Sequence, residues 1–397
     1  MTEQDQRLLG TAALEAGRWE EARAAFAAAL AEKETPEALD GMGVALWWLG
    51  ETRASIAHTE RAYAEFRRAS DAVPAATAAM SLCVTWISNF DNHAAAGGWL
   101  ARAERVLGDL DPNPLQGWLW LLRGYLEPDT GRARELQQRV LELARATGDP
   151  DLELCALGDL GLTLVTQGRA AEGLALIDEA MAGTLGGEHR RLDTVVIASC
   201  DMLVACDLAG DLRRAVQWCQ VADQFINRYG CPFLYARCRT LYGGVLMAKG
   251  RWEEAEALLP ERGGGRAAAR TAARLRLARG EPSVAVGLLE RSLEDDGQPG
   301  IHGERHLRAA AALETLVAAQ LALGDPGAAA AAAARLAELA EAEGDSHGGG
   351  QVAAMAAQAG ARVAAAAGRS EEARRLLERA LVLFSDDDLP YETALAR

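Results

Sequence analysis

The sequence predicts an all-α superhelix of about nine helix-turn-helix pairs. Long runs with one apolar side end on glycines throughout the chain, and the turn glycines recur at intervals of 30 to 44 residues. A recurrence in this range is typical of helical solenoids, in which each pair packs only on its neighbours. Alanine, which has the highest helix propensity, supplies much of the 50% hydrophobic content and favours thin, closely packed helices.

The clearest module runs from Leu192 to Pro260 and reads as four helices separated by glycine-containing turns. Four places in the chain share a finer spacing, in which a mid-helix glycine precedes the turn glycine by seven residues. These pairs are Gly10 with Gly17, Gly43 with Gly50, Gly161 with Gly168, and Gly243 with Gly250. We expect the first glycine to let the partner helix approach closely and the second to end its helix in a left-handed conformation.

The turn itself has a recognisable sequence. Gly17-Arg18-Trp19-Glu20-Glu21-Ala22 is nearly copied by Gly250-Arg251-Trp252-Glu253-Glu254-Ala255. The small mid-helix residue, the aromatic after the turn glycine and the alanine five positions after it resemble tetratricopeptide repeats. This resemblance covers nearly the whole chain and implies a right-handed superhelix whose first helices line a concave groove.

Two longer stretches carry a more specific resemblance. The opening, from Leu9 to Gly50, and the block from Ala215 to Leu246 resemble the repeat region of LuxR-type bacterial transcriptional regulators. The resemblance implies a sensor or interaction region without its output half. After Phe384 the sequence is too short for a DNA-binding helix-turn-helix, and it contains no Gly-x-x-x-x-Gly-Lys-[Ser/Thr] phosphate loop.

The chain is predicted to form two continuous stacks. Residues 1–260 form an N-terminal stack of six pairs, and residues 261–397 an alanine-rich stack of three, with a glycine-rich hinge near 263–265. Between Ser81 and Leu126 no clean turn glycine occurs, so we expect one distorted unit there.

The composition of the chain limits the kinds of partner and the cellular location that we expect. A net charge of −16 repels phosphate backbones, so we expect no direct nucleic-acid partner. The polar start lacks a signal peptide, and no apolar run reaches the ~20 residues of a membrane span. The seven cysteines have no Cys-x-x-Cys spacing and lie mostly in apolar helical runs. We therefore expect a soluble, cytoplasmic protein with reduced thiols.

Several side chains are candidates for ligand binding. Trp47, Tyr235 and Arg237 lie on or near the predicted groove surface, whereas Trp86 and Trp118 fall in an N-terminal third that is rich in tryptophan. Each tryptophan alone is more typical of core packing. Together with Asn89 and His93, however, the tryptophans could wall a pocket for a flat molecule.

Asp201 is the remaining candidate, because it stands in a helix that is apolar nearly all round. A buried carboxylate requires a partner, and Arg237 and Arg239 on the next unit are the natural ones. The sequence favours a structural ion pair and leaves open a ligand-facing role.

No catalytic motif, cofactor site or metal site is predicted. His302 and His306 have the i, i+4 spacing of a metal clamp, but Gly303 between them argues against a formed helix. We expect a non-catalytic protein that binds a peptide, a protein partner or a small effector in its groove, linked to transcriptional regulation. The alternative is a small-molecule-binding protein or an enzyme of specialised metabolism that has reused the scaffold. Homo-oligomerisation through the alanine-rich pairs is compatible with either.

Overall fold

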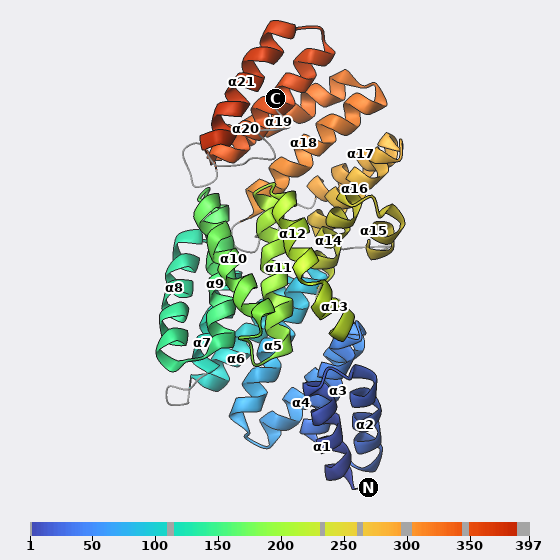
Figure 1. The fold of residues 1–397 in the computed structure, drawn as a ribbon, viewed down its shortest axis with the longest axis vertical. Coiled ribbons are helices and arrows are strands. Elements are labelled where there is room, and N and C mark those ends of the chain that lie inside the picture. The colour runs from blue at the N-terminus through green and yellow to red at the C-terminus, as the bar shows by residue number, and fades with distance from the viewer. Residues whose placement is uncertain are drawn as a thin grey trace.

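The computed structural model describes residues 2–108, 115–230, 235–259, 265–294, 304–343 and 349–386. Within these ranges the chain forms 21 helices and no strand. The helices follow one another as ten pairs that rise along the long axis of the molecule (Figure 1). The predicted all-α superhelix of helix-turn-helix pairs is therefore confirmed.

The pairs are α1 (Glu3–Glu15) with α2 (Trp19–Glu32), α3 (Pro36–Trp48) with α4 (Thr52–Arg68), α5 (Ala72–Phe90) with α6 (His93–Leu107), α7 (Leu115–Leu126) with α8 (Thr130–Thr147), α9 (Pro150–Thr166) with α10 (Ala170–Gly186), α11 (Leu192–Leu208) with α12 (Leu212–Val221) and its continuation α13 (Asp223–Tyr229), α14 (Ala236–Ala248) with α15 (Trp252–Leu258), α16 (Gly265–Ala278) with α17 (Pro282–Glu294), α18 (Arg305–Leu323) with α19 (Pro326–Glu343), and α20 (Gly349–Ala366) with α21 (Ser370–Asp386).

The tenth pair comes from the stretch in which we expected one distorted unit. Helix α5 continues to Phe90, and α6 begins at His93 after a turn of two residues. Asp91 takes the left-handed conformation at this turn, with a φ of 52°. Aspartate tolerates that conformation better than most residues, so the turn forms without a glycine.

The turn glycines and the mid-helix glycines have the structural roles that their spacing predicts. The eight predicted turn glycines all have positive φ, between 66° and 82°. At the mid-helix positions the partner helix comes very close. A Cβ added to Gly161 on α9 would lie 2.6 Å from the carbonyl oxygen of Gly173 on α10. The absence of side chains at both positions therefore sets the distance between these two helices.

Replacing Gly161 by alanine is expected to destabilise the fold by about 1–3 kcal/mol, because the added methyl group overlaps backbone of α10. Gly98→Ala in α6 is the matched control, since its methyl group meets nothing within 4 Å. The control is expected to be neutral or to stabilise by up to about 1 kcal/mol. Denaturant unfolding of both variants measures the difference, and equal losses would contradict this account.

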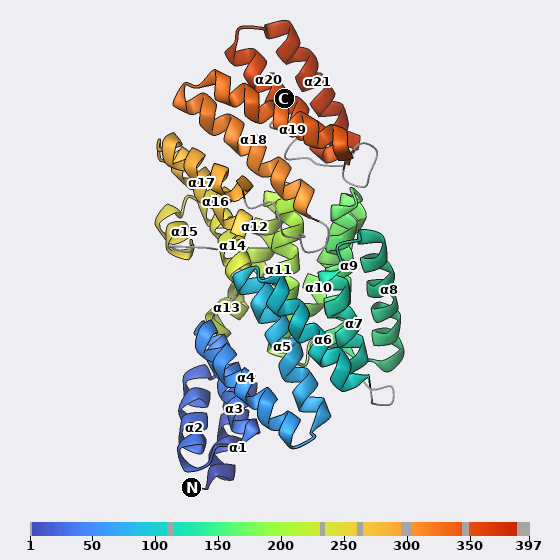
Figure 2. The ribbon, with the colours of Figure 1, turned by 180° about the vertical axis from the view of Figure 1, so that it is seen from behind.

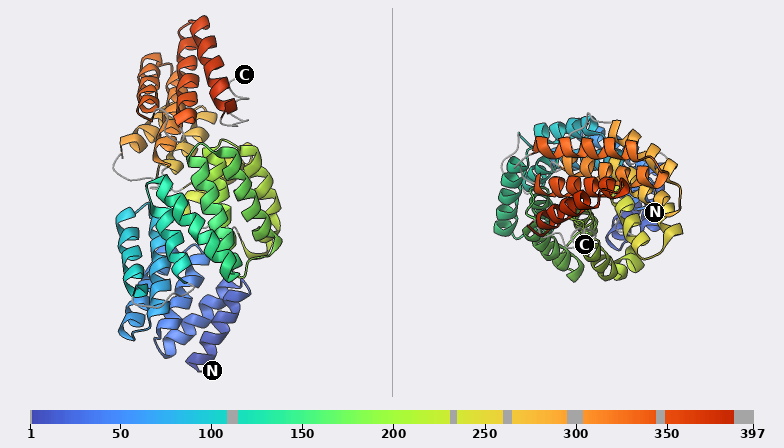
Figure 3. Two further views of the ribbon diagram at one scale, coloured as in Figure 1. Left: turned by 90° about the vertical axis from the view of Figure 1, so that its left-hand side faces the viewer. Right: turned by 90° about the horizontal axis from the view of Figure 1, so that it is seen from above.

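After one turn the superhelix contacts its own beginning. The indole nitrogen of Trp19 donates a hydrogen bond to the Tyr229 carbonyl at 2.9 Å, and the Trp48 ring stacks on Trp19 with centroids 4.1 Å apart. The Ala236 amide donates to the Asn89 side-chain oxygen at 3.1 Å. Figure 2 shows α5 beside α14, and Figure 3 shows the helices as a ring when seen along the long axis.

The last three pairs continue upward from this ring. The Gln351 side chain on α20 donates to the Leu208 carbonyl at the end of α11, which holds α20 against the ring. The predicted hinge falls mostly outside the described residues, which resume at Gly265.

One helix of the described residues, α5, is long and apolar enough to cross a membrane by composition, but 56% of its most apolar window is buried inside the fold. It packs as a core helix of the ring.

The ring contact can be tested at Trp19. Trp19→Phe keeps an aromatic ring against Trp48 but leaves the Tyr229 carbonyl without its donor, so we expect a loss of about 1 kcal/mol. Trp252→Phe is the matched control at the same position of the repeat, because no hydrogen bond from its indole occurs in the described structure. Thermal melting compares the two, and an equal effect would show that the contact across the turn adds nothing.

Candidate functional site

A cavity of about 560 Å³ lies inside the ring. Its wall comes chiefly from the first helices of successive pairs, α3, α5, α7, α9, α11 and α14. These are the helices expected to face the concave side of the superhelix. The volume lies within the range of about 300–1,000 Å³ that small-molecule sites occupy.

Aromatic side chains form one side of the cavity. Trp47 on α3 packs against Tyr235, which precedes α14, with ring centroids 5.7 Å apart. Trp47 also meets Trp48 edge-on at 5.2 Å, and Trp48 carries the stack onto Trp19. Trp118 on α7 lies farther along the same cavity. The contact that closes the ring and the aromatic wall therefore form one continuous cluster.

Five of the eight candidate residues line this cavity, namely Trp47, Trp118, Asp201, Tyr235 and Arg237. The other three lie elsewhere. Trp86 packs against Phe90, with centroids 5.2 Å apart, Asn89 accepts the Ala236 amide, and His93 lies 3.4 Å from the Asp91 carboxylate. Helix α5 lines the cavity with both polar and apolar side chains, and Trp86 is not among them. These side chains are Thr77, Met80, Ser81, Leu82, Val84, Thr85 and Ser88.

Two carboxyl groups from neighbouring helices lie on the cavity wall. Asp159 on α9 and Asp201 on α11 are both buried, with 3% and 4% of their surface exposed. Burial raises the pKa of Asp201 to about 8. Burial, together with the nearby Asp201, holds the pKa of Asp159 well above its usual range. The Oδ2 atom of Asp201 has no hydrogen-bond partner in the described structure.

A third carboxyl group, Asp40 on α3, also lines the cavity. Burial raises its pKa to about 6, and Glu37 adds to the shift. Within the described ranges Asp40 takes part in no ion pair and no side-chain hydrogen bond. The cavity wall thus contains two carboxyl groups, Asp40 and Asp201, that form no ion pair in the described structure.

The expected ion pair between Asp201 and an arginine is not formed. Arg237 bonds Glu304, the residue directly before α18, and Glu304 also holds Arg308 at 2.7 Å. Arg239 lines a separate cleft with Phe90. Arg237 still lowers the pKa of Asp201 from a distance, although burial dominates. The ion pair of Arg237 depends on the superhelical twist that brings α18 to α14, which local sequence does not reveal.

Sequence reasoning overlooked two features of the wall. Asp159 is the only charged residue between Leu154 and Thr166, the same signal that singled out Asp201. Cys200 on α11 and Cys238 on α14 form a disulfide, with Cα atoms 5.4 Å apart, and both line the cavity. We expected free thiols, and their wide separation in sequence gave no indication of this pairing.

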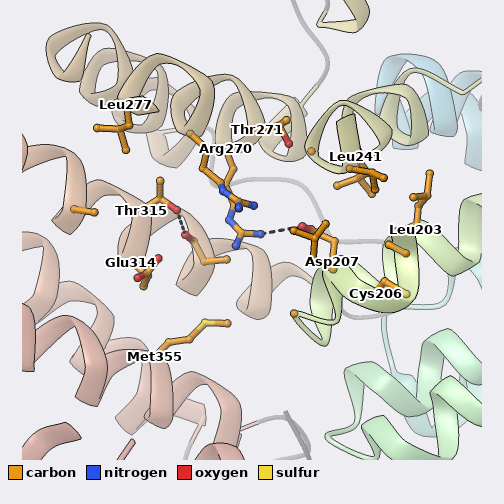
Figure 4. Close-up of a pocket in the computed structure, with 18 of the residues that line it drawn as sticks. Leu203, Cys206, Asp207, Leu241, Arg270, Thr271, Leu277, Glu314, Thr315 and Met355 are labelled. Atoms are coloured by element: carbon orange, nitrogen blue, oxygen red, sulfur yellow. Dashed lines mark hydrogen bonds and ion pairs between the residues drawn. The ribbon is translucent and has the colours of Figure 1, made fainter. Parts of the chain in front are cut away.

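A smaller cavity of about 260 Å³ lies farther up, between α11, α14, α16, α18 and α20 (Figure 4). Its acidic groups are paired. Arg270 donates to Asp207 at 3.1 Å, as Figure 4 shows, and Arg362 bonds Glu314. Internal ion pairs occupy the charged groups of this space.

No site for a metal ion is visible in the described part of the chain, where no three His, Cys, Asp or Glu side chains gather. His302, half of the histidine pair considered above, lies outside the described residues. The chemistry available in the main cavity is that of carboxyl groups beside aromatic rings.

The chain matches no known protein family, and no curated protein matches it. Among solved structures, a Rap protein complexed with competence and sporulation factor is 11% identical, covering 100% of this chain and 99% of that one, with a TM-score of 0.47. The Cut9–Hcn1 hetero-tetramer of the APC/C is 13% identical over 100% and 90%, with a TM-score of 0.42. Yeast Tom70 is 11% identical over 99% and 94%, with a TM-score of 0.36.

Likenesses this distant carry no argument about function. The fold and the site define a helical-repeat protein in which one turn of the superhelix encloses a cavity. We therefore argue function from the residues of the chain itself.

The charge state of Asp201 has a measurable effect on stability. Its folded pKa of about 8 lies above the unfolded value, so the folded state holds the proton and loses stability as pH rises from about 4 through 8. Asp201→Asn removes this loss and is expected to be more stable than the wild type at pH 8, by at least about 1 kcal/mol. At pH 5 the difference should shrink.

Melting curves at pH 5 and pH 8 measure this effect. Asp207→Asn serves as the control, because it breaks the bond to Arg270 and should destabilise the protein at both pH values. A variant at Asp201 that is less stable than the wild type at pH 8 would show that the carboxylate is compensated in the fold.

Proposed function

We propose that this protein is a non-catalytic sensor that holds one small molecule in the cavity inside its ring. The supporting observation is that Trp47, Trp118 and Tyr235 line a space of about 560 Å³ together with Asp40 and Asp201, which form no ion pair in the described structure. Apolar lining with a few convergent polar groups is the usual composition of a small-molecule site.

The ring contact favours a small molecule over an extended peptide. An open groove binds a segment along its length. Here the Trp19–Tyr229 hydrogen bond joins the first pair to the sixth, and the Asn89–Ala236 hydrogen bond joins the third pair to the seventh. The cavity is therefore bounded by helices from one whole turn. Peptide and protein partners remain candidates for the outer surface.

A link to transcriptional regulation in a bacterial cytoplasm rests on the resemblance to the repeat region of LuxR-type regulators. In that case we expect a partner protein to respond to occupancy of the cavity. The two stacks, residues 1–260 and 261–397, would then act as the ligand-binding part and the partner-binding part.

A second candidate function is catalysis. Asp201 has a pKa of about 8 inside a cavity, and such a group is suited to general acid or base work near neutral pH. No metal-binding cluster of His, Cys, Asp or Glu accompanies it in the described structure. We therefore place catalysis second, to be tested by turnover of any molecule that binds.

The test compares two tryptophans. A panel of small aromatic molecules and short peptides is screened for an increase in melting temperature, which binding to the folded state must produce. Trp118→Leu alters the cavity wall and should weaken a hit about tenfold or more, given what a buried aromatic anchor contributes. Trp86→Leu removes a tryptophan outside the cavity and should change affinity less than about twofold.

Equal effects of the two variants would place the ligand outside the cavity and contradict the proposal. Stabilisation by peptides alone would also contradict it and favour an interaction scaffold.

A further inference from the structure

We propose that the ligand of the main cavity carries a cationic nitrogen, an ammonium or amidinium group, which binds at the Asp159–Asp201 pair with its apolar body against Trp47, Trp118 and Tyr235. This inference rests on the proposed function and names the chemical class of the molecule bound. It is carried by three independent features of the wall: the state of its carboxyl groups, the state of its arginines and the aromatic rings.

The acidic and the basic side chains of the cavity wall differ in whether they have bonding partners within the protein. Asp201 is 4% exposed and Oδ2 has no hydrogen-bond partner, and Asp40 has neither an ion pair nor a side-chain hydrogen bond in the described structure. The three arginines of the wall are engaged elsewhere. Arg237 bonds Glu304, Arg191 bonds Asp193, and the Arg190 guanidinium donates to the Gly148 carbonyl. None of them bonds Asp201, and a cationic group of the ligand supplies the partner that the buried Oδ2 atom lacks.

The aromatic side of the cavity fits the same class of ligand. The faces of tryptophan and tyrosine rings attract a cation within about 6 Å, most strongly where water is excluded. The wall already makes one such contact, between the Arg191 guanidinium and the Trp118 ring, at 5.6 Å. An anionic ligand would instead meet the negative faces of these rings with repulsion.

Burial explains why the empty site is stable. Two carboxylates in an apolar wall are costly when ionised, so each retains a proton at neutral pH. The groups that face Asp201 are Asp159 and Cys155 on α9, Tyr125 on α7, and Tyr235 and Arg237 at α14, of which only Arg237 is a cation. An ammonium group entering here replaces a proton, which leaves to solvent, and the pair becomes a charge-assisted hydrogen bond.

In the smaller cavity of Figure 4 the acidic side chains form ion pairs with arginines of the same protein. There Asp207 and Glu314 each bond an arginine, so both acidic groups that line this cavity already have a cationic partner. The difference between the two cavities is a property of their wall residues, because both lie along the same superhelix and both are lined by α11 and α14.

The test uses three probes of one shape: phenethylamine, phenethyl alcohol and 3-phenylpropionate, titrated into the full chain by calorimetry at pH 7. We expect the amine to bind at least about tenfold more tightly than the alcohol, and the carboxylate not to bind. Asp201→Asn and Asp159→Asn should each weaken the amine about tenfold or more while leaving the alcohol unchanged. Asp178→Asn, a surface variant beside Trp218, is the matched control.

A second readout does not depend on the variants. Titration of the amine in buffers of different ionisation enthalpy should report release of about one proton per molecule bound, the number expected when an ammonium replaces one carboxyl proton. Binding of the amine with no proton release would overturn the assignment of the cation to this pair.

The remaining outcomes separate this inference from the proposed function. If the alcohol and the carboxylate bind as tightly as the amine, and Trp118→Leu weakens all three, the cationic ligand is wrong and the small-molecule cavity stands. If neither phenethylamine nor tetramethylammonium binds, the inference is overturned. If the neutral molecules of the wider panel also fail to bind, the proposed function falls with it.

Discussion

The hydrogen bond from the Trp19 indole to the Tyr229 carbonyl joins residues 210 positions apart, and the cavity depends on it. In a repeat array each pair ordinarily contacts only its neighbours. Here one extra contact, strengthened by the stack of Trp19 on Trp48, links the first pair to the sixth. This contact closes one turn of the superhelix into a ring around the cavity. The aromatic wall of the cavity continues directly from the residues that close the ring.

The repeat architecture could be predicted because its determinants are local. Glycines at fixed spacing end the helices and set how closely they pack, and Gly161 with Gly173 shows the contact directly. The additional helix pair, which the sequence did not predict, also has a local cause. Asp91 adopts a conformation usually left to glycine, and aspartate is too common for its presence to identify a turn.

The cavity was harder to predict than the helices. Helical periodicity places Trp47 and Asp201 on inward faces, but only the twist of successive pairs decides what they face. Glu304 reaches Arg237 across 67 residues, and Cys200 joins Cys238 across 38. Such pairings depend on the rotation between units, which accumulates from small packing angles along the chain. The isolated carboxyl of Asp159, by contrast, could have been recognised from the apolar run around it.

Glu304 occupies a position with a consequence for the upper part of the molecule. It bonds Arg237 on the cavity wall and Arg308 in the first turn of α18, so one carboxylate is shared between the ring and the three last pairs. A charged molecule placed in the cavity would act on Arg237 and, through Glu304, on the packing of the last three pairs against the ring. Binding and packing would then be linked equilibria, each shifting the other by the same coupling free energy.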